Sequence, residues 1–245
     1  MKFKDRVVLV TGGARGIGAA TASRFAQEGA RVVVSDMDLA PAEEVAGPIK
    51  GVAVACDVTS REQVEAMVGQ AVSELGRLDV LVCCAGIIRD NMLFKMSDDD
   101  WDSVIDTHLK GTFLCARAAQ KPMVEQKYGK MVFLSSTSAL GNRGQTNYST
   151  AKAGLQGMAR TLAIELGPFN INVNTVAPGF VETRMTRATA ERMGVDFETF
   201  KVGAASQIPL RRIGQPEDIA SVISFLCSQD SSFVSGQTIY VRGGP

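Results

Sequence analysis

Residues 7–25 read VVLVTGGARGIGAATASRF, and this stretch decides the fold. It begins with a short apolar run rich in β-branched residues, which predicts a buried strand. A glycine-rich turn follows, with Gly12, Gly16 and Gly18 spaced G-x-x-x-G-x-G, and the chain then enters a helical stretch. Glycines let a backbone approach a pyrophosphate, and a helix start supplies N–H donors and a positive dipole. A glycine turn alone is ordinary chain punctuation, but its place between strand and helix predicts a dinucleotide-binding loop.

The rest of the chain alternates apolar, β-branched runs with stretches of helical spacing. Most of the runs are continuously apolar, as strands buried on both faces are. The predicted strands are Val7–Val10, Val32–Ser35, Val52–Ala55, Val80–Cys83, Met131–Leu134, Ile171–Val176 and Thr238–Val241. The main helices between them are predicted at Ala19–Glu28, Arg61–Leu75, Ala151–Leu166 and Pro216–Leu226. This order predicts one α/β domain over residues 1–245, with a Rossmann-like, doubly wound, seven-stranded parallel sheet and helices on both faces.

One segment, approximately residues 183–208, breaks the alternation. It is mixed in composition and only weakly periodic, and it follows the sixth predicted strand. An insertion at the carboxyl end of such a strand is where a substrate lid would lie. The alternative is a pair of surface helices that pack their own apolar residues.

Composition excludes several classes of function. Of the 245 residues, 45% are hydrophobic and 21% charged, and Lys+Arg and Asp+Glu both number 26, so there is no basic excess for nucleic acid or an anionic membrane. The five cysteines form no CxxC pair, which indicates a reducing, cytoplasmic setting, and the single histidine argues against a metal site. No apolar run approaches the length of a membrane span, and the start of the chain does not resemble a signal peptide.

The second predicted strand ends at an acid, Asp36, in RVVVSDMD. A carboxylate in that place can bind both hydroxyls of an adenosine ribose and would repel a 2′-phosphate, so it favours NAD over NADP. Arg15 in the glycine loop is a weaker signal in the other direction, because a guanidinium can pair with a phosphate. The plain alternative for Asp36 is a solvated acid in a turn.

Residues 147–154 read NYSTAKAG and place Lys152 four positions after Tyr148. On a helix these two side chains lie on one face, one turn apart. An ammonium beside a phenol favours the phenolate, which is one way to make a proton acceptor from a group with a pKa of about 10. Without the glycine loop and Asp36, the better reading of such a pair would be an exposed amphipathic helix.

The whole chain resembles a single-domain short-chain dehydrogenase/reductase. The resemblance is carried by TGGARGIG at 11–18, DV at 57–58, CAG at 84–86, NYSTAK at 147–152 and APGFVET at 177–183, in the family's order and spacing. It implies hydride transfer between nicotinamide and a carbinol or carbonyl carbon. It also implies the following cofactor-binding residues: Gly12, Arg15, Gly16, Ile17, Gly18, Asp36, Asp57, Val58, Ala85, Gly86, Tyr148, Lys152, Pro178, Gly179, Val181 and Thr183.

The same resemblance implies that Tyr148 exchanges the substrate's hydroxyl proton with the help of Lys152. For this, the Tyr148 pKa must fall by about three units, or about 4 kcal/mol, through Lys152 and the positive nicotinamide. A serine hydroxyl should polarise the substrate oxygen. The family's usual spacing to the tyrosine gives Ser135, whereas strand register and the spacing from His108 favour Ser136. Because neighbouring strand residues point to opposite faces, only one of them can serve.

The sequence departs from the family at two positions. His108 stands where an asparagine usually helps to hold a water linked to the lysine. An imidazole donates and accepts hydrogen bonds as an amide does, so we predict that His108 joins a proton relay, with the added property of titrating near pH 6.5. The alternative is a core histidine that only braces its helix. Cys84 replaces an asparagine that braces the central strands, and we expect it to pack as a small apolar group.

Within the family, the chain is most similar to 3-oxoacyl-[acyl-carrier-protein] reductases and (3R)-hydroxyacyl-CoA dehydrogenases. The segments that carry this similarity are AGIIRDNMLFKMSDDDW, GNRGQTNY, APGFVETRMT, PLRRIGQPEDIA and FVSGQTIYVRGG. They imply a 3-hydroxyacyl or 3-oxoacyl thioester as substrate, carried by CoA or a carrier protein. His108 together with Asp36 favours the (3R)-hydroxyacyl-CoA dehydrogenases, whose members often share these features. Reductases of fatty-acid synthesis usually prefer NADPH, which Asp36 disfavours.

Two other functions fit the sequence. One is an NAD-dependent dehydrogenase of another secondary alcohol, such as a polyol, a cyclic alcohol or a hydroxysteroid. The other is a dinucleotide-sensing protein without turnover, which would be expected to have lost Tyr148 or Lys152. The resemblance further implies a homotetramer formed through 111–126, 151–166 and the last strand.

Overall fold

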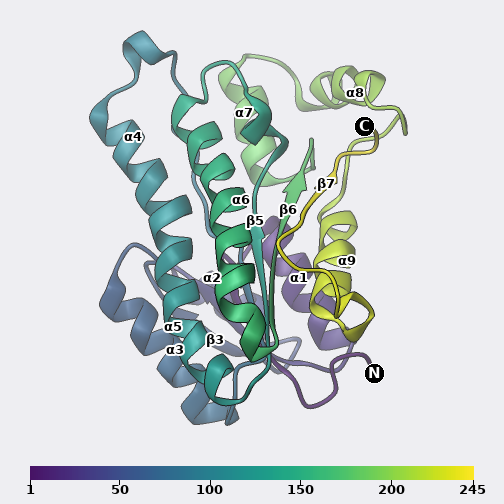
Figure 1. The fold of residues 1–245 in the computed structure, drawn as a ribbon. Helices are drawn as coiled ribbons and strands as arrows, with labels where there is room; N and C mark the ends of the chain where they lie inside the picture. The colour runs from purple at the N-terminus through teal and green to yellow at the C-terminus, as the bar shows by residue number, and fades with distance from the viewer.

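The computed structural model describes residues 1–245, and its centre is one seven-stranded sheet (Figure 1). Every strand pair is parallel, and the strand order is β3-β2-β1-β4-β5-β6-β7. The strands are β1 (Val7–Thr11), β2 (Arg31–Asp36), β3 (Val52–Ala55), β4 (Val80–Cys83), β5 (Gly129–Leu134), β6 (Ile171–Pro178) and β7 (Thr238–Val241). The predicted fold class is confirmed, and each predicted strand lies within an observed one.

Helices cover both faces of the sheet. The alternation of side chains along β1 sends Val7 and Leu9 to one core and Val8 and Val10 to the other. The first core is covered by α3 (Arg61–Leu75), α5 (Gly111–Glu125) and α6 (Thr146–Leu166), and the second by α1 (Gly16–Gln27), α2 (Leu39–Ala46) and α9 (Pro216–Cys227). Burial on both faces explains why the strand segments read as unbroken apolar runs.

The helix boundaries show which local signals were sufficient. Helix α3 has the predicted bounds, because Ser60 caps its start and Gly76 ends it in the left-handed conformation. The predicted start of α6 at Ala151 is wrong, since the helix begins at Thr146 and so includes Tyr148. No side chain caps that start, and the sequence therefore carried no signal for it. Helix α1 likewise begins at Gly16, inside the glycine turn.

The remaining elements connect the core helices. Helix α4 (Asp98–Ile105) begins with a capping box between Ser97 and Asp100 and continues through a π-helical turn, Asp106–Lys110, into α5. Short 3₁₀ turns lie at Leu93–Lys95, Thr137–Leu140, Gly167–Phe169 and Gln229–Ser231. In the segment predicted as a lid, α7 (Arg184–Arg192) and α8 (Phe197–Gln207) lie near the carboxyl end of β6, at the top of Figure 1. None of the helices is both long enough and apolar enough to cross a lipid bilayer.

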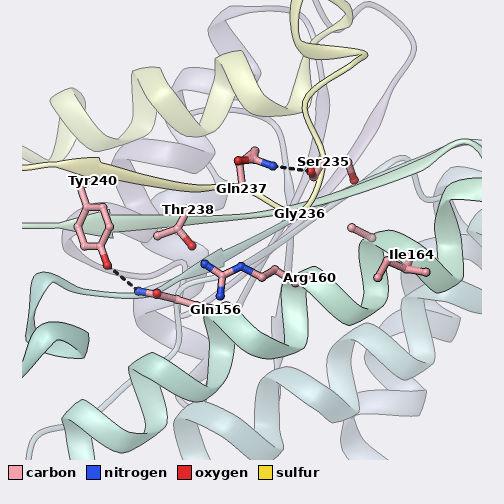
Figure 2. A pocket seen from close by; sticks show the side chains of 9 residues that line it. Gln156, Arg160, Ile164, Ser235, Gly236, Gln237, Thr238 and Tyr240 are labelled. Atoms are coloured by element: carbon pink, nitrogen blue, oxygen red, sulfur yellow. Dashed lines mark hydrogen bonds between the residues drawn. The ribbon is translucent and has the colours of Figure 1, made fainter.

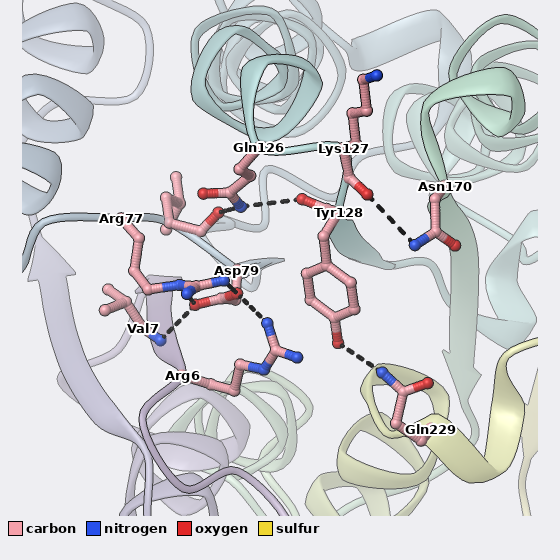
Figure 3. Close-up of polar contacts among 10 residues, drawn as sticks. Arg6, Val7, Arg77, Asp79, Gln126, Lys127, Tyr128, Asn170 and Gln229 are labelled. Carbon is pink, nitrogen blue, oxygen red and sulfur yellow. Dashed lines mark hydrogen bonds and ion pairs between the residues drawn. The ribbon is translucent and has the colours of Figure 1, made fainter.

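An ionic cluster lies at the amino ends of the central strands, opposite the carboxyl ends where the lid segment lies (Figure 3). The fully buried carboxylate of Asp79 accepts hydrogen bonds from Arg6 at 2.7 Å, from two nitrogens of Arg77 at 2.7 Å and from the backbone N–H of Val7 at 2.9 Å. The Arg6 guanidinium also lies 4.1 Å from the centre of the Tyr128 ring. Asp79 therefore joins the starts of β1 and β4.

We expect Asp79→Ala to lower the free energy of unfolding by about 1–3 kcal/mol, because it leaves the buried N–H of Val7 without an acceptor and removes the ion pairs of two partly exposed arginines. Urea unfolding measures this change. The matched control is Asp230→Asn, which breaks an exposed pair with Lys2 and should change stability by less than about 0.5 kcal/mol. Equal effects of the two substitutions would contradict a structural role for the cluster.

Candidate active site

The glycine loop passes so close to its neighbours that side chains are excluded. Gly12 and Gly16 have φ angles of +62° and +52°, which favour glycine. A Cβ at Gly12 would lie 2.5 Å from the backbone nitrogen of Ala85, and one at Gly18 would collide with the carbonyl oxygen of Gly12. The loop after β1 is thus pressed against the loop after β4, where the strand order reverses. In open α/β sheets, ligands bind at this switch point.

Asp36 lies at the end of β2, directly beside the glycine loop. Its Oδ2 accepts the N–H of Ala14 at 3.1 Å and its Oδ1 accepts the N–H of Met37 at 2.9 Å. These bonds fix the carboxylate next to the loop and leave each oxygen with further acceptor capacity. Arg15, the residue before α1, is exposed. The arrangement fits an adenosine ribose bound by its hydroxyls.

The other predicted cofactor residues follow β3, β4 and β6, at the carboxyl ends of the strands. Asp57 accepts the N–H and hydroxyl of Thr59, and Val58 lies against Gly111. The structure brings the members of the predicted set to the carboxyl ends of the strands as follows: Gly12, Arg15, Gly16, Ile17 and Gly18 after β1, Asp36 on β2, Asp57 and Val58 after β3, Ala85 and Gly86 after β4, and Pro178, Gly179, Val181 and Thr183 at and after β6. The glycine cradle and this continuous edge fit a dinucleotide.

The two candidate serines point to different partners. Ser135 is buried, and its hydroxyl donates to the carbonyl of Lys152 at 2.8 Å. Ser136 instead accepts the N–H of Ser138 at 3.0 Å, and its side chain acts on the phenol of Tyr148, whose pKa it lowers. Only Ser136 therefore faces the phenol, while Ser135 braces the helix that carries it.

Lys152 lies next to Tyr148 on α6, with its Nζ 5.4 Å from the centre of the Tyr148 ring. The ammonium is buried and donates to the carbonyl oxygen of Leu134. Burial lowers the pKa of Lys152 from 10.5 to about 8. Its charge is thus held by a strand-end carbonyl and not by the phenol.

The pKa of Tyr148 does not fall in this arrangement. Burial raises it from 10.0 to about 12, the Ser136 side chain acts in the lowering direction, and the negative charge of Asp90 raises it further. Lys152 is not among the groups that shift the Tyr148 pKa in this arrangement, and the predicted lowering, which also depends on a bound nicotinamide, stays a prediction.

His108 is buried in the π-helical turn and packs edge-on against Tyr148, with the ring centres 5.1 Å apart. Its Nε2 lies 3.0 Å from the nitrogen and 2.8 Å from the oxygen of Ile87, and its Nδ1 has no partner. Burial, followed by the charge of Lys152, lowers the His108 pKa well below 6.5. The expectation that it titrates near pH 6.5 is wrong, and the imidazole is neutral at physiological pH.

Cys84 packs against the core on the α1 side of the sheet, as expected of a small apolar group. Burial raises the pKa of its thiol from 9.0 to about 12, so the reactive thiolate is disfavoured.

Asn147 is a positioning residue that the sequence did not single out. It is fully buried, and its Nδ2 donates to the carbonyls of Arg89 and Asp100, both at 2.9 Å. Its Oδ1 accepts the N–H of Tyr148 at 2.8 Å. Asn147 thereby fixes the first turn of α6 to α4 and to the loop after β4. Its partners are backbone groups far away in sequence, so no local pattern could have revealed this role.

A polar pocket lies beside the active helix, between α6 and β7 (Figure 2). It contains none of the predicted cofactor or catalytic residues. Gln156 on α6 donates to the hydroxyl of Tyr240 at 3.2 Å and to that of Ser135 at 3.1 Å. Gln156 therefore connects Tyr240 on β7 to Ser135, whose hydroxyl donates to the carbonyl of Lys152 on α6.

A parallel sheet with a glycine cradle at its switch point, and a Tyr-x-x-x-Lys helix beside a serine, defines a nicotinamide-dependent oxidoreductase of the short-chain type. The comparisons agree, since residues 12–245 match the family model described as "Enoyl-(Acyl carrier protein) reductase". The chain belongs to the short-chain dehydrogenase/reductase family.

Several known proteins are similar over nearly the whole chain. The chain is 43% identical to "3-oxoacyl-[acyl-carrier-protein] reductase FabG" of Thermotoga maritima, covering 100% of this chain and 99% of that protein. It is also 43% identical to "(2S)-[(R)-hydroxy(phenyl)methyl]succinyl-CoA dehydrogenase subunit BbsD" of Thauera aromatica, covering 100% of this chain and 98% of that protein. Among solved structures, "Crystal structure of gox2181" matches with a TM-score of 0.92 and 34% identity over 99% of this chain and 96% of that chain.

The lowered pKa of Lys152 predicts a pH dependence of stability. Between about pH 8 and the value of 10.5 for a free lysine, the unfolded chain binds more protons at this residue than the folded chain does. Stability therefore rises with pH in this window through Lys152 and is lost as the pH falls toward 8. We expect wild type to gain about 1–2 kcal/mol relative to Lys152→Met between pH 8 and pH 9.5.

Urea unfolding at the two pH values measures this difference. Lys4→Met is the matched control, because Lys4 is exposed and forms no ion pair. It should retain the pH dependence of wild type. If Lys152→Met retains it too, the lysine is not desolvated as described.

Proposed function

We propose that the protein is an NAD-dependent oxidoreductase that interconverts a 3-hydroxyacyl and a 3-oxoacyl thioester. The observation that carries the proposal is the placement of Tyr148 and Ser136 at the same sheet edge as the glycine loop and Asp36. A hydride acceptor and a proton acceptor are both needed to oxidise a secondary alcohol. The carboxyl ends of the strands provide a cradle for the first and the phenol of Tyr148 for the second.

Asp36 supports NAD as the cofactor. The nicotinamide supplies hydride chemistry when it is bound. The chain's own contribution is to hold the dinucleotide on the N–H groups of the glycine loop and to accept ribose hydroxyls on the carboxylate of Asp36. A 2′-phosphate would meet that carboxylate and be repelled, with only Arg15 nearby to offset it.

Tyr148 is the proposed acid and base of the reaction. In the oxidative direction its phenolate takes the proton from the substrate hydroxyl, and in the reductive direction its phenol returns it. The Ser136 hydroxyl donates a hydrogen bond to the substrate oxygen and orients it. With a pKa of about 12, Tyr148 is a poor base near neutral pH, so further positive charge must reach it. Lys152 is the chain's own source of that charge, once its ammonium turns from Leu134.

His108 is proposed to pass protons between solvent and Lys152. Its unpartnered Nδ1 and its bond to the backbone of Ile87 give a neutral imidazole one free position for a bridging water. Because its pKa is depressed, it acts as a neutral donor and acceptor and not as a second cation beside Lys152.

The substrate class rests on relatives whose names specify thioesters. One is a reductase of acyl-carrier-protein esters and the other a dehydrogenase of a CoA ester. The helices α7 and α8, placed near the carboxyl end of β6, are proposed as the lid that covers such a substrate. The proposal extends to a cytoplasmic homotetramer, by analogy with the family.

The test is an absorbance assay at 340 nm with NAD or NADP and a panel of 3-hydroxyacyl-CoA esters, polyols, cyclic alcohols and hydroxysteroids. We expect turnover with the thioesters and NAD. Tyr148→Phe should reduce kcat by a factor of about 100 or more while leaving NAD binding intact, because only the transferable proton is lost.

The other outcomes separate the alternatives. Turnover confined to polyols, cyclic alcohols or steroids would identify a dehydrogenase of that substrate. Binding of NAD without turnover of any compound would favour a sensor. Rates with NADP equal to those with NAD would remove the role given to Asp36.

His108 is tested by a pair of substitutions in the same assay. We expect His108→Ala to lower kcat by about tenfold to a hundredfold, and His108→Asn to retain most of it, because an amide can hold the same water. If His108→Ala leaves turnover and its pH profile unchanged, the histidine only braces its helix.

A further inference from the structure

Helix α7 bridges two loops of the active site. At its start, the Thr183 hydroxyl accepts the N–H of Thr186 at 3.3 Å, and the Thr183 side chain lies against Gly16 of the glycine loop. At its end, the Nη2 of Arg192 lies 3.6 Å from the Oδ2 of Asp90, in the loop after β4. The helix therefore crosses from the cofactor loop to the loop that neighbours Tyr148.

Asp90 lies where the loop after β4 is hydrogen-bonded to the segment that precedes α6. Its Oδ2 accepts a hydrogen bond from Gln145, which directly precedes α6, at 2.9 Å. The N–H of Asn91 donates to the carbonyl of Gly144 at 2.9 Å and pairs the same two loops through their backbones. The negative charge of Asp90 also raises the pKa of Tyr148.

The contact between Arg192 and Asp90 is incomplete. The separation of 3.6 Å is longer than a hydrogen bond, and the Oδ1 of Asp90 is buried without any partner. A buried carboxylate oxygen without a donor is costly, whereas a guanidinium can donate to both oxygens of one carboxylate. The Arg192 side chain is 48% exposed and so has room to move.

We propose that Asp90 and Arg192 form a clasp that fixes α7 over the substrate side of Tyr148. When a substrate lies beneath α7, Arg192 moves onto both oxygens of Asp90 and the long contact becomes a two-bond pair. Both are positioning residues, because they act on the substrate through α7 and take no part in proton or hydride transfer. The identity of the substrate rests on the proposed function, but the clasp does not.

The kinetic test uses NAD and 3-hydroxybutyryl-CoA with four variants. Asp90→Asn keeps the bond to Gln145 and removes the charge, and Arg192→Met removes the guanidinium. We expect each to raise KM by about fivefold to twentyfold with kcat within about threefold, and the double variant to be no worse than either single one. Arg192→Lys should restore part of the loss. Additive effects in the double variant would overturn the clasp.

A second measurement requires no turnover. Hydrogen exchange of residues 184–192 is followed with NAD alone and with NAD plus 3-hydroxybutyryl-CoA. We expect faster exchange in Asp90→Asn and Arg192→Met than in wild type under both conditions. Glu191→Gln is the control, because Glu191 is exposed, lies beside Arg192 and forms no ion pair, and it should match wild type.

The two measurements separate the clasp from the proposed function. If the thioester is not turned over by any form of the protein, the proposed function fails, and the exchange with NAD alone decides the clasp. If α7 exchanges equally in wild type and in both clasp variants, the clasp is overturned whatever the activity.

Discussion

The close approach of Gly12 to the backbone of Ala85 is the constraint on which the site depends. It brings the loops after β1 and β4 into contact at the point where the sheet changes direction. Gly18 adds a second exclusion, since only a hydrogen atom fits against the carbonyl of Gly12. The absence of side chains leaves the space that forms the cradle. Asp36 accepts a hydrogen bond from the N–H of Ala14 in this loop, and the side chain of Thr183 packs against Gly16.

Burial shifts the pKa of each residue proposed to take part in proton transfer. Burial disfavours the ammonium of Lys152, the phenolate of Tyr148 and the imidazolium of His108, so each is moved toward its neutral form. Near neutral pH, Tyr148 and His108 are therefore neutral, while Lys152 keeps most of its charge. The environment that raises the Tyr148 pKa also has a low dielectric, in which a new positive charge acts strongly.

Much of the fold followed from local patterns, whereas the details of the site did not. Continuous apolar runs located the strands because burial on both faces demands them, and Ser60 and Gly76 gave the bounds of α3 by capping it. The start of α6 was missed because nothing caps it locally. Its first turn is held by Asn147, through carbonyls contributed by other parts of the chain. The pKa shifts could not be predicted from sequence spacing, because their largest cause is burial, which depends on the packing of the whole site.

The polar contacts around the site fall into two layers of different rigidity. Behind Tyr148, the side chains of Asn147, Ser135 and Lys152 are buried and bonded to backbone groups, which cannot move without disturbing the sheet or its helices. Above it, α7 is held at its free end by a half-exposed arginine at a distance longer than a hydrogen bond. The side chains behind Tyr148 are therefore held more rigidly than the free end of α7.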